Sequence, residues 1–271
     1  MRTRVAASLV FCLAVLAAAT AHAQYTFQGS SNRATGETYR VEVGGFLWNP
    51  TPDILIASED FDIIGEEIDF VEDLGIEKKR HTQLRVVLRP ATKHKFRFEY
   101  TPIKYSAEGE IRRTVTFNGV EFPVELPVAT ELIWRAYRFG YEWDFVYMDR
   151  GFVGLLLEAK YTHVEASLAN VLQSEFIRAR APIPAIGVIG RGYVTPNIAI
   201  TGEFSAFRLP DSIDEDYSGK FYDFDLYGTV NFTDNFGVQG GYRSFDVFFR
   251  VENDEGSMTM KGLYIGGVAR F

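Results

Sequence analysis

The chain has 271 residues, among them 24 glycines, 23 phenylalanines and 14 tyrosines, and it carries 28 basic against 36 acidic side chains. The net charge of −8 argues against nucleic acid as a partner, because phosphate backbones bind basic surfaces. The single cysteine excludes an intrachain disulfide and any metal site built from several thiolates. The length is sufficient for one large sheet domain or two small domains.

The N-terminal segment has the three-part layout of a secretory signal peptide. Two arginines precede an apolar stretch, which is followed by small residues ending at Ala23, directly before Gln24. We expect cleavage between Ala23 and Gln24, because the apolar stretch is too short to span a bilayer comfortably. The predicted organisation is a signal peptide over residues 1–23, a polar leader over residues 24–37 and a single domain over residues 38–271.

From residue 38 onward, apolar and polar residues alternate in segments of about ten residues, the length of a tilted membrane strand. Phe96 and Phe98, for example, fall on one face of a strand, and Arg97 and Glu99 fall on the other. The pattern predicts an all-β fold, a transmembrane antiparallel up-and-down β-barrel of about ten strands, with eight or twelve as alternatives. The predicted strands cover residues 38–48, 81–90, 94–106, 128–143, 151–165, 183–194, 197–208, 220–232, 235–249 and 257–271.

A soluble secreted β-sandwich would also alternate, so the position of the aromatic residues decides between the two folds. Aromatic residues gather near the ends of predicted strands, as at Tyr137, Tyr141 and Trp143, or at Phe232 and Phe236. This placement is typical of the girdles that lie at the two surfaces of a membrane. The barrel is therefore the favoured interpretation.

The chain ends in Gly266-Gly267-Val268-Ala269-Arg270-Phe271. This segment resembles the terminal strand of bacterial outer-membrane β-barrel proteins, a general class that includes small barrels similar to OmpA and OmpW. The resemblance implies an outer-membrane location, Phe271 as an assembly signal, and the barrel-assembly machinery and periplasmic chaperones as partners. Outer-membrane lipid and lipopolysaccharide would surround the barrel.

The inward face of the predicted barrel carries charges of both signs on neighbouring strands. Because a ten-stranded barrel is narrow, we expect long side chains to meet across it and form salt bridges. A packed, salt-bridged lumen is the favoured interpretation, and a narrow porin-like channel for small solutes or ions is the alternative. The predicted inward residues are Arg40, Glu42, Arg85, Arg89, Arg97, Glu99, Arg138, Glu142, Glu158, Lys160, Arg191, Glu203, Asp223, Asp225, Arg243 and Arg270.

Two connections stand out among the predicted outer loops, in which residues 166–182 form a further long connection. Residues 49–79 hold many carboxylates between apolar residues, which suits either a solvated acidic face or a divalent-cation site. Residues 107–126 contain Asn118-Gly119 between short apolar runs, a strong hairpin signal. We expect the adjoining strands to continue above the membrane there as a protruding ribbon. The alternative is a docking or adhesion surface, because exposed strand edges recruit partners by β-augmentation.

The sequence offers no complete catalytic constellation. Three histidines follow the signal peptide, His81, His94 and His163, and the barrel fold separates them. The barrel proteases called omptins pair an acidic dyad with an Asp-His couple, and Asp223 with Asp225 supply only half of such a site. The sequence therefore predicts no cofactor, no metal site and no enzyme, with a structural or surface-interaction role as the favoured function and an outer-membrane hydrolase acting on lipid or peptide as the third alternative.

Overall fold

The computed structural model of the chain describes residues 34–57, 68–117, 119–124, 126–209, 217–251 and 254–271. The predicted signal peptide, with its cleavage residues Ala23 and Gln24, lies outside the described residues. Residues 34–271 form one compact unit. In the described part of the chain there is no helix of the length and apolarity needed to cross a bilayer.

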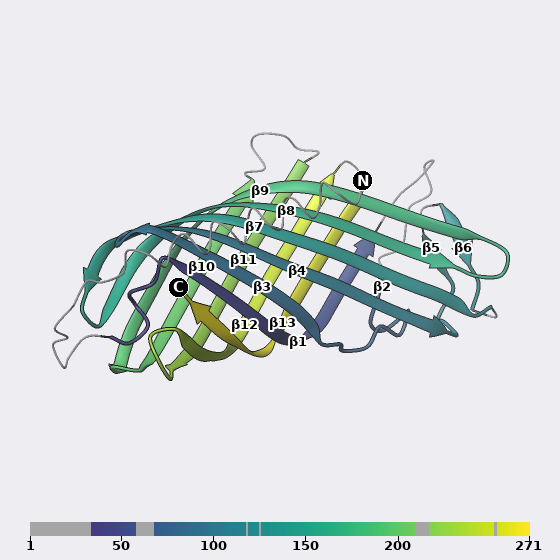
Figure 1. Ribbon diagram of the computed structural model, residues 1–271. Helices are drawn as coiled ribbons and strands as arrows, with labels where there is room; N and C mark the ends of the chain where they lie inside the picture. Colours follow the sequence, from purple (N-terminus) through teal and green to yellow (C-terminus); the bar gives the residue numbers. More distant parts are fainter. Residues whose placement is uncertain (1–33, 58–67, 118, 125, 210–216, 252–253) are drawn as a thin grey trace, which may run out of the picture. The chain divides into compact units, whose positions relative to one another are not determined.

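Ten long antiparallel strands close into a barrel, in which each strand pairs with the next long strand along the chain (Figure 1). Pairing of β13 with β1 closes the ring. The strand number and the up-and-down order confirm the predicted fold class. The long strands are β1 (Val41–Ala57), β3 (His81–Ala91), β4 (His94–Gly109), β7 (Val128–Met148), β8 (Gly151–Ala169), β9 (Ser174–Thr195), β10 (Ile198–Leu209), β11 (Tyr217–Asn231), β12 (Phe236–Val251) and β13 (Asp254–Arg270), and the short ones are β2 (Ile68–Asp69), β5 (Val115–Phe117) and β6 (Val120–Phe122).

Burial alternates along the strands and separates an apolar outer face from a charged inner face. In β8, Leu157 is 55% exposed, whereas the next residue, Glu158, is 6% exposed. Each of the ten long strands carries exposed large apolar side chains of this kind. A continuous belt of exposed apolar side chains is favourable in contact with lipid and unfavourable in contact with water. The outer face of the barrel therefore faces the hydrocarbon core of the outer membrane.

The two ends of the barrel differ in their connections. At one end the strands are joined by residues 92–93, 149–150, 196–197 and 232–235. Phe271 lies at this end, since its backbone exchanges hydrogen bonds with Val41 at the start of β1. Short turns are typical of the periplasmic side of outer-membrane barrels, so the longer strands and loops at the other end are extracellular.

Three strands rise far above the membrane. β7, β8 and β9 have 21, 19 and 22 residues, about twice the length needed to cross a bilayer. The predicted long loop over residues 166–182 is therefore wrong, because only residues 170–173 connect β8 to β9. β1 likewise continues to Ala57, nine residues beyond the end that the sequence predicts.

Two prolines concealed the length of β9 in the sequence. Pro182 and Pro184 pair with Tyr161 and Ala159 of β8. The pairing of β9 with β10 begins only at Ile186, so the preceding part of β9 is an edge strand. An edge strand tolerates proline because the missing N–H would otherwise point away from the sheet.

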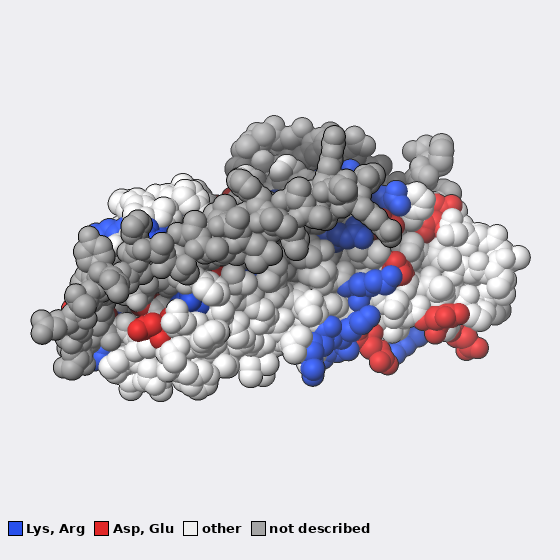
Figure 2. Space-filling view, in the orientation of Figure 1, with Lys and Arg blue, Asp and Glu red and all other residues white. Residues whose placement is uncertain are grey.

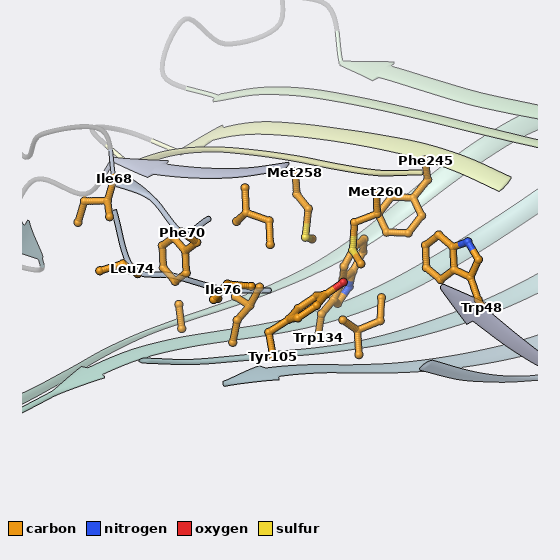
Figure 3. Close-up of a cluster of buried hydrophobic side chains, with 14 of the residues drawn as sticks. Trp48, Ile68, Phe70, Leu74, Ile76, Tyr105, Trp134, Phe245, Met258 and Met260 are labelled. Atoms are coloured by element: carbon orange, nitrogen blue, oxygen red, sulfur yellow. The ribbon is translucent and has the colours of Figure 1, made fainter. Parts of the chain in front are cut away.

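Inside the extracellular part, the strands enclose a hydrophobic core (Figure 3). Residues 68–76 of the first loop enter it, with Ile68 and Phe70 fully buried. Figure 3 shows Ile68, Phe70, Leu74 and Ile76 of this segment in one cluster with Met258 of β13 and Tyr105 of β4. Burial of the apolar residues of this loop explains why a segment rich in carboxylates also carries so many isoleucines.

The predicted hairpin within residues 107–126 exists, but it is not a free ribbon. β5 and β6 form a separate two-stranded sheet, and Gly119 in their turn has a φ of 72°. Val115, Phe117 and Phe122 of this hairpin are buried in the same hydrophobic core. The apolar residues that predict these two strands form one face of the hairpin. The hairpin folds inward because this face is buried in the core. β4 and β7 do continue above the membrane, paired up to Gly109 and Val128.

Candidate functional site

The membrane-level interior of the barrel holds one connected network of buried ion pairs. Alternation along the strands sends every second side chain inward, and register places residues of neighbouring strands at the same height. The structure brings together eleven of the predicted inward residues with Lys95 and Asp144. The members are Arg85, Lys95, Arg97, Glu99, Arg138, Glu142, Asp144, Glu158, Lys160, Glu203, Asp223, Asp225 and Arg243.

Arg138 lies at the centre of this lumen network. Its Nη1 atom is 3.8 Å from carboxylate oxygens of both Glu99 and Asp223, and its Nη2 atom is 3.5 Å from Glu203. Its guanidinium also pairs with Glu158 on the neighbouring strand. The planar guanidinium therefore lies within ion-pair distance of four carboxylates from four strands. Its fork of several N–H donors makes this possible, and the compact ammonium group of lysine has no such fork.

The periplasmic side of the network is a chain of alternating charges. Arg97 lies 3.0 Å from Glu142 and 2.6 Å from Glu203. Lys95, two residues earlier on the same face of β4, lies 2.5 Å from Glu142 and 2.9 Å from Asp144. Lys95 and Asp144 were not among the predicted inward residues, although each has the same parity along its strand as a predicted inward residue.

The extracellular side of the network is built on Asp223, which is 2.9 Å from Arg243 and 3.0 Å from Lys160. Arg243 also pairs with Glu99 across the lumen. Arg85 lies 3.4 Å from Glu99 and 3.4 Å from Asp225. Each charge in this group therefore has at least one opposite charge within ion-pair distance.

Two tyrosines donate hydrogen bonds to carboxylates of the network. The Tyr227 hydroxyl donates to Glu203 at 2.9 Å, and the Tyr264 hydroxyl donates to Asp225 at 2.9 Å. The two hydroxyls come from strands β11 and β13. Buried charges are stable only when they are both paired and hydrogen-bonded, and these contacts meet that requirement.

A second cluster closes the periplasmic end and includes Glu37 of the leader. Glu37 lies 2.8 Å from Arg191 and 3.5 Å from Arg89, and it accepts a hydrogen bond from the Tyr193 hydroxyl at 2.8 Å. The segment before β1 is therefore fixed inside the base of the barrel. The sequence analysis missed Glu37, because the leader has no alternation that would mark an inward residue.

Glu42 and Arg270 form a further buried pair at 2.6 Å, where β1 meets β13. Arg40 is different, because its side chain is exposed and does not face the lumen. It precedes the first paired residue of β1, so the alternation that placed it inward does not extend to it. Tyr39 is the buried side chain at that level.

Buried charge in the described part of the chain is balanced, with nine carboxylates and nine lysine or arginine side chains among the buried residues. Each of these charges has a partner of opposite sign, so the described buried residues carry no net surplus of charge. Between the network and the hydrophobic core lies a cavity of about 30 Å³, lined by Trp48, Trp134, Phe221 and Phe245 together with charged residues of the network. That volume corresponds to one water molecule.

The candidate catalytic residues are dispersed. His81 is buried against Tyr105, with ring centroids 4.8 Å apart, and His94 contacts the Tyr141 hydroxyl near the periplasmic turn. His163 lies on the outer face of β8, where Arg180 donates a hydrogen bond to it at 3.2 Å. None of these three histidines forms an ion pair with Asp223 or Asp225, which belong to the lumen network.

The acidic first loop is only partly within the described residues. Glu59, Asp60, Asp62, Glu66 and Glu67 lie outside them. Of the carboxylates that are described, Asp73 is engaged by Arg113, whose Nη2 lies 2.8 Å away. Within the described ranges no group of three metal-ligating side chains comes together.

Comparison with known proteins gives structural neighbours only, since no protein-family model and no curated protein sequence matches the chain. The outer-membrane protease OmpT from Escherichia coli superimposes with a TM-score of 0.61 at 8% sequence identity, over 88% of this chain and 98% of that one. The fold is that of an outer-membrane β-barrel.

Two further neighbours of this outer-membrane barrel are more distant. Ail, the attachment invasion locus protein of Yersinia pestis, has a TM-score of 0.38 at 12% identity, over 86% of this chain and 99% of that one. Neisserial surface protein A has a TM-score of 0.35 at 13% identity, over 85% of this chain and 97% of that one. The neighbours include a protease and proteins without a named enzymatic activity, so they assign no specific role.

Proposed function

We propose that this protein is a plugged, non-conducting outer-membrane barrel whose role depends on the sheet that it raises above the membrane. One observation carries the proposal: the interior is filled along its length, by the Glu37 cluster at the base, the lumen network at membrane level and the hydrophobic core above it. A water-filled pore needs charged walls separated by solvent, whereas these charges contact one another.

The hairpin of β8 and β9 offers the most exposed apolar surface of that sheet. Val171 and Leu172 at its tip are 83% and 78% exposed. The Asn170 side chain fixes the turn by accepting hydrogen bonds from the backbone N–H groups of Leu172 and Gln173, both at 2.9 Å. Apolar side chains held rigidly at a hairpin tip favour contact with a partner outside the cell.

The Gln173 side chain also donates a hydrogen bond to the backbone carbonyl of Glu121, so the tip adjoins the β5–β6 hairpin. The predicted docking surface at residues 107–126 thus becomes part of a composite surface in the proposal. Val124, 38% exposed, lies on that part.

The proposal includes the barrel-assembly machinery and its chaperones as partners during biogenesis. Phe271 is 65% exposed at the periplasmic end of the folded barrel. Deletion of Phe271 should lower the amount of heat-modifiable barrel in the outer membrane of cells, measured against the same chain with Arg40→Gln. Equal yields of the two variants would count against Phe271 as an assembly signal.

The main test is single-channel recording of the refolded protein in a planar bilayer, after a shift in mobility between unboiled and boiled gel samples has verified a folded barrel. We expect no discrete openings, with a known porin in the same bilayer as the positive control. Reproducible steps whose ion selectivity changes in Glu203→Gln would overturn the proposal and favour the narrow channel.

A further inference from the structure

On one side of the barrel, three tyrosines mark the outer boundary of the membrane. Tyr100, Tyr137 and Tyr161 are directly paired across β4, β7 and β8. The rings of Tyr100 and Tyr137 are 4.8 Å apart, and those of Tyr137 and Tyr161 are 6.5 Å apart. Contiguous tyrosines on an outward face are typical of the interface between acyl chains and headgroups.

The next outward row is basic. Register places Arg135 beside His163 and His163 beside Arg180, two residues farther from the membrane than the tyrosines. This step corresponds to about 7 Å along a strand, and the two arginines lie about 10 Å apart across three strands. The row therefore sits at the height of lipid headgroups.

Both guanidiniums in this row are available to a ligand. Arg135 and Arg180 are exposed, and within the described ranges neither forms an ion pair with a carboxylate. Their basic neighbours are instead neutralised, with Lys104 2.6 Å from Glu131 and Arg178 2.9 Å from Glu165. On the face seen in Figure 2, Lys and Arg side chains form a band across the barrel.

Below the tyrosines, the lipid-facing surface of the same strands is hollowed. A groove of about 520 Å³ lies among outward side chains of β3, β4, β7 and β8. Its walls include Phe96, Phe98, Phe139 and Leu157, and the small side chain of Ala159 leaves the space between them. The dimensions and apolar walls suit one or two acyl chains.

We infer that this surface is a binding site for a phosphorylated glycolipid of the outer leaflet. Arg135 and Arg180 hold its phosphate groups, the tyrosine row contacts its sugars, and the groove receives an acyl chain. Guanidinium groups bind phosphate oxygens with two parallel hydrogen bonds, so two exposed arginines at headgroup height, with no carboxylate partner in the described ranges, are suited to this ligand. The inference is independent of whether the lumen conducts.

The test compares binding of diphosphoryl lipid A with binding of the same lipid after removal of its phosphates, by native mass spectrometry of the detergent-refolded protein. We expect the unmodified protein to prefer the phosphorylated form. Arg135→Gln combined with Arg180→Gln should weaken binding of that form at least tenfold and abolish the preference. The matched control is Arg40→Gln combined with Lys93→Gln, which removes two exposed charges at the periplasmic end.

Two further arms separate the parts of the site. Ala159→Leu, which fills the groove, should weaken the binding of both lipid forms several-fold. The preference for the phosphorylated form should remain. Inorganic phosphate at millimolar concentration should not displace the lipid. The inference is wrong if the control variant loses as much binding as the arginine variant, if both lipid forms bind equally to the unmodified protein, or if free phosphate displaces the lipid fully.

Discussion

The Nη2 atom of Arg97 lies 2.6 Å from Oε1 of Glu203, and these residues belong to β4 and β10, four strands apart around the ring of ten. The contact is therefore a tie across the lumen and not a pairing of neighbours in one wall. Arg243 of β12 and Glu99 of β4 make a second such tie. Cross-lumen ties fix the distance between opposite walls, so a permeating solute would have to break buried ion pairs.

The first prediction concerns Glu203, which neutralises both Arg97 and Arg138. Glu203→Ala should lower the free energy of unfolding by about 3–5 kcal/mol, because it removes a carboxylate shared by two buried guanidiniums and leaves the network with an uncompensated positive charge. Urea titration followed by the gel mobility of the folded barrel would measure the change. Glu255→Ala is the matched control, since its pair with Arg250 is exposed and should change stability by no more than about 1 kcal/mol. Equal midpoints for the two variants would contradict a structural role of the network.

The second prediction concerns the leader. Glu37→Ala should release the segment that begins at residue 34, because Arg191 and Arg89 lose their shared carboxylate. Hydrogen exchange of residues 34–40 should become faster, while exchange in the middle of β11 stays unchanged. Glu77→Ala, at an exposed position in the first loop, is the control. If exchange at residues 34–40 is unaffected in Glu37→Ala, the leader is held by its backbone contacts alone.

The sequence predicted the barrel because a single period of two residues runs through every membrane strand. The same alternation identified most of the lumen network, as for Arg97 and Glu99 on β4. It did not identify Asp144, because the predicted strand ends at residue 143, whereas β7 continues to Met148. Nor could it predict that Glu37 points inward, since the alternation of inward and outward side chains holds only within a strand.

The extracellular extensions escaped prediction for a different reason. On β7, Arg138 points inward and Phe139 outward at membrane level, whereas Trp134 points inward and Arg135 outward above it. The faces are the same but their polarity is inverted, because lipid lies outside the lower part and the hydrophobic core lies inside the upper part. A sequence scan for apolar-outward alternation stops at this inversion, which itself marks the membrane boundary near Tyr137.

The third prediction concerns the hydrophobic core at the mouth. Phe70→Ala should destabilise the packed first loop by about 3–5 kcal/mol, the usual cost of removing a fully buried phenylalanine side chain. The effect should be local, with faster hydrogen exchange over residues 68–76 and an unchanged urea midpoint for the barrel strands. Val124→Ala, at a partly exposed position on the neighbouring hairpin, should change neither quantity measurably. A lower midpoint for the whole barrel in Phe70→Ala would mean that the core and the barrel unfold together.

The fourth prediction concerns the pH dependence of the same loop. Burial alone would raise the pKa of the Asp73 carboxyl, but hydrogen bonds and charge from Arg113, with a backbone hydrogen bond from Asp69, hold that pKa below its usual value of 3.8. A lowered pKa in the folded state means that the contact stabilises the loop fully at pH values well above 3.8 and that this stabilisation is lost as the pH falls through the lowered value. Proteolysis of the first loop by an acid-active protease should therefore accelerate below that range in the unmodified protein. Asp73→Asn should be cleaved faster near neutral pH, by a neutral protease, and should lose this acid-dependent step. An acid-dependent step of the same size in Asp73→Asn would assign the titration to another carboxyl group.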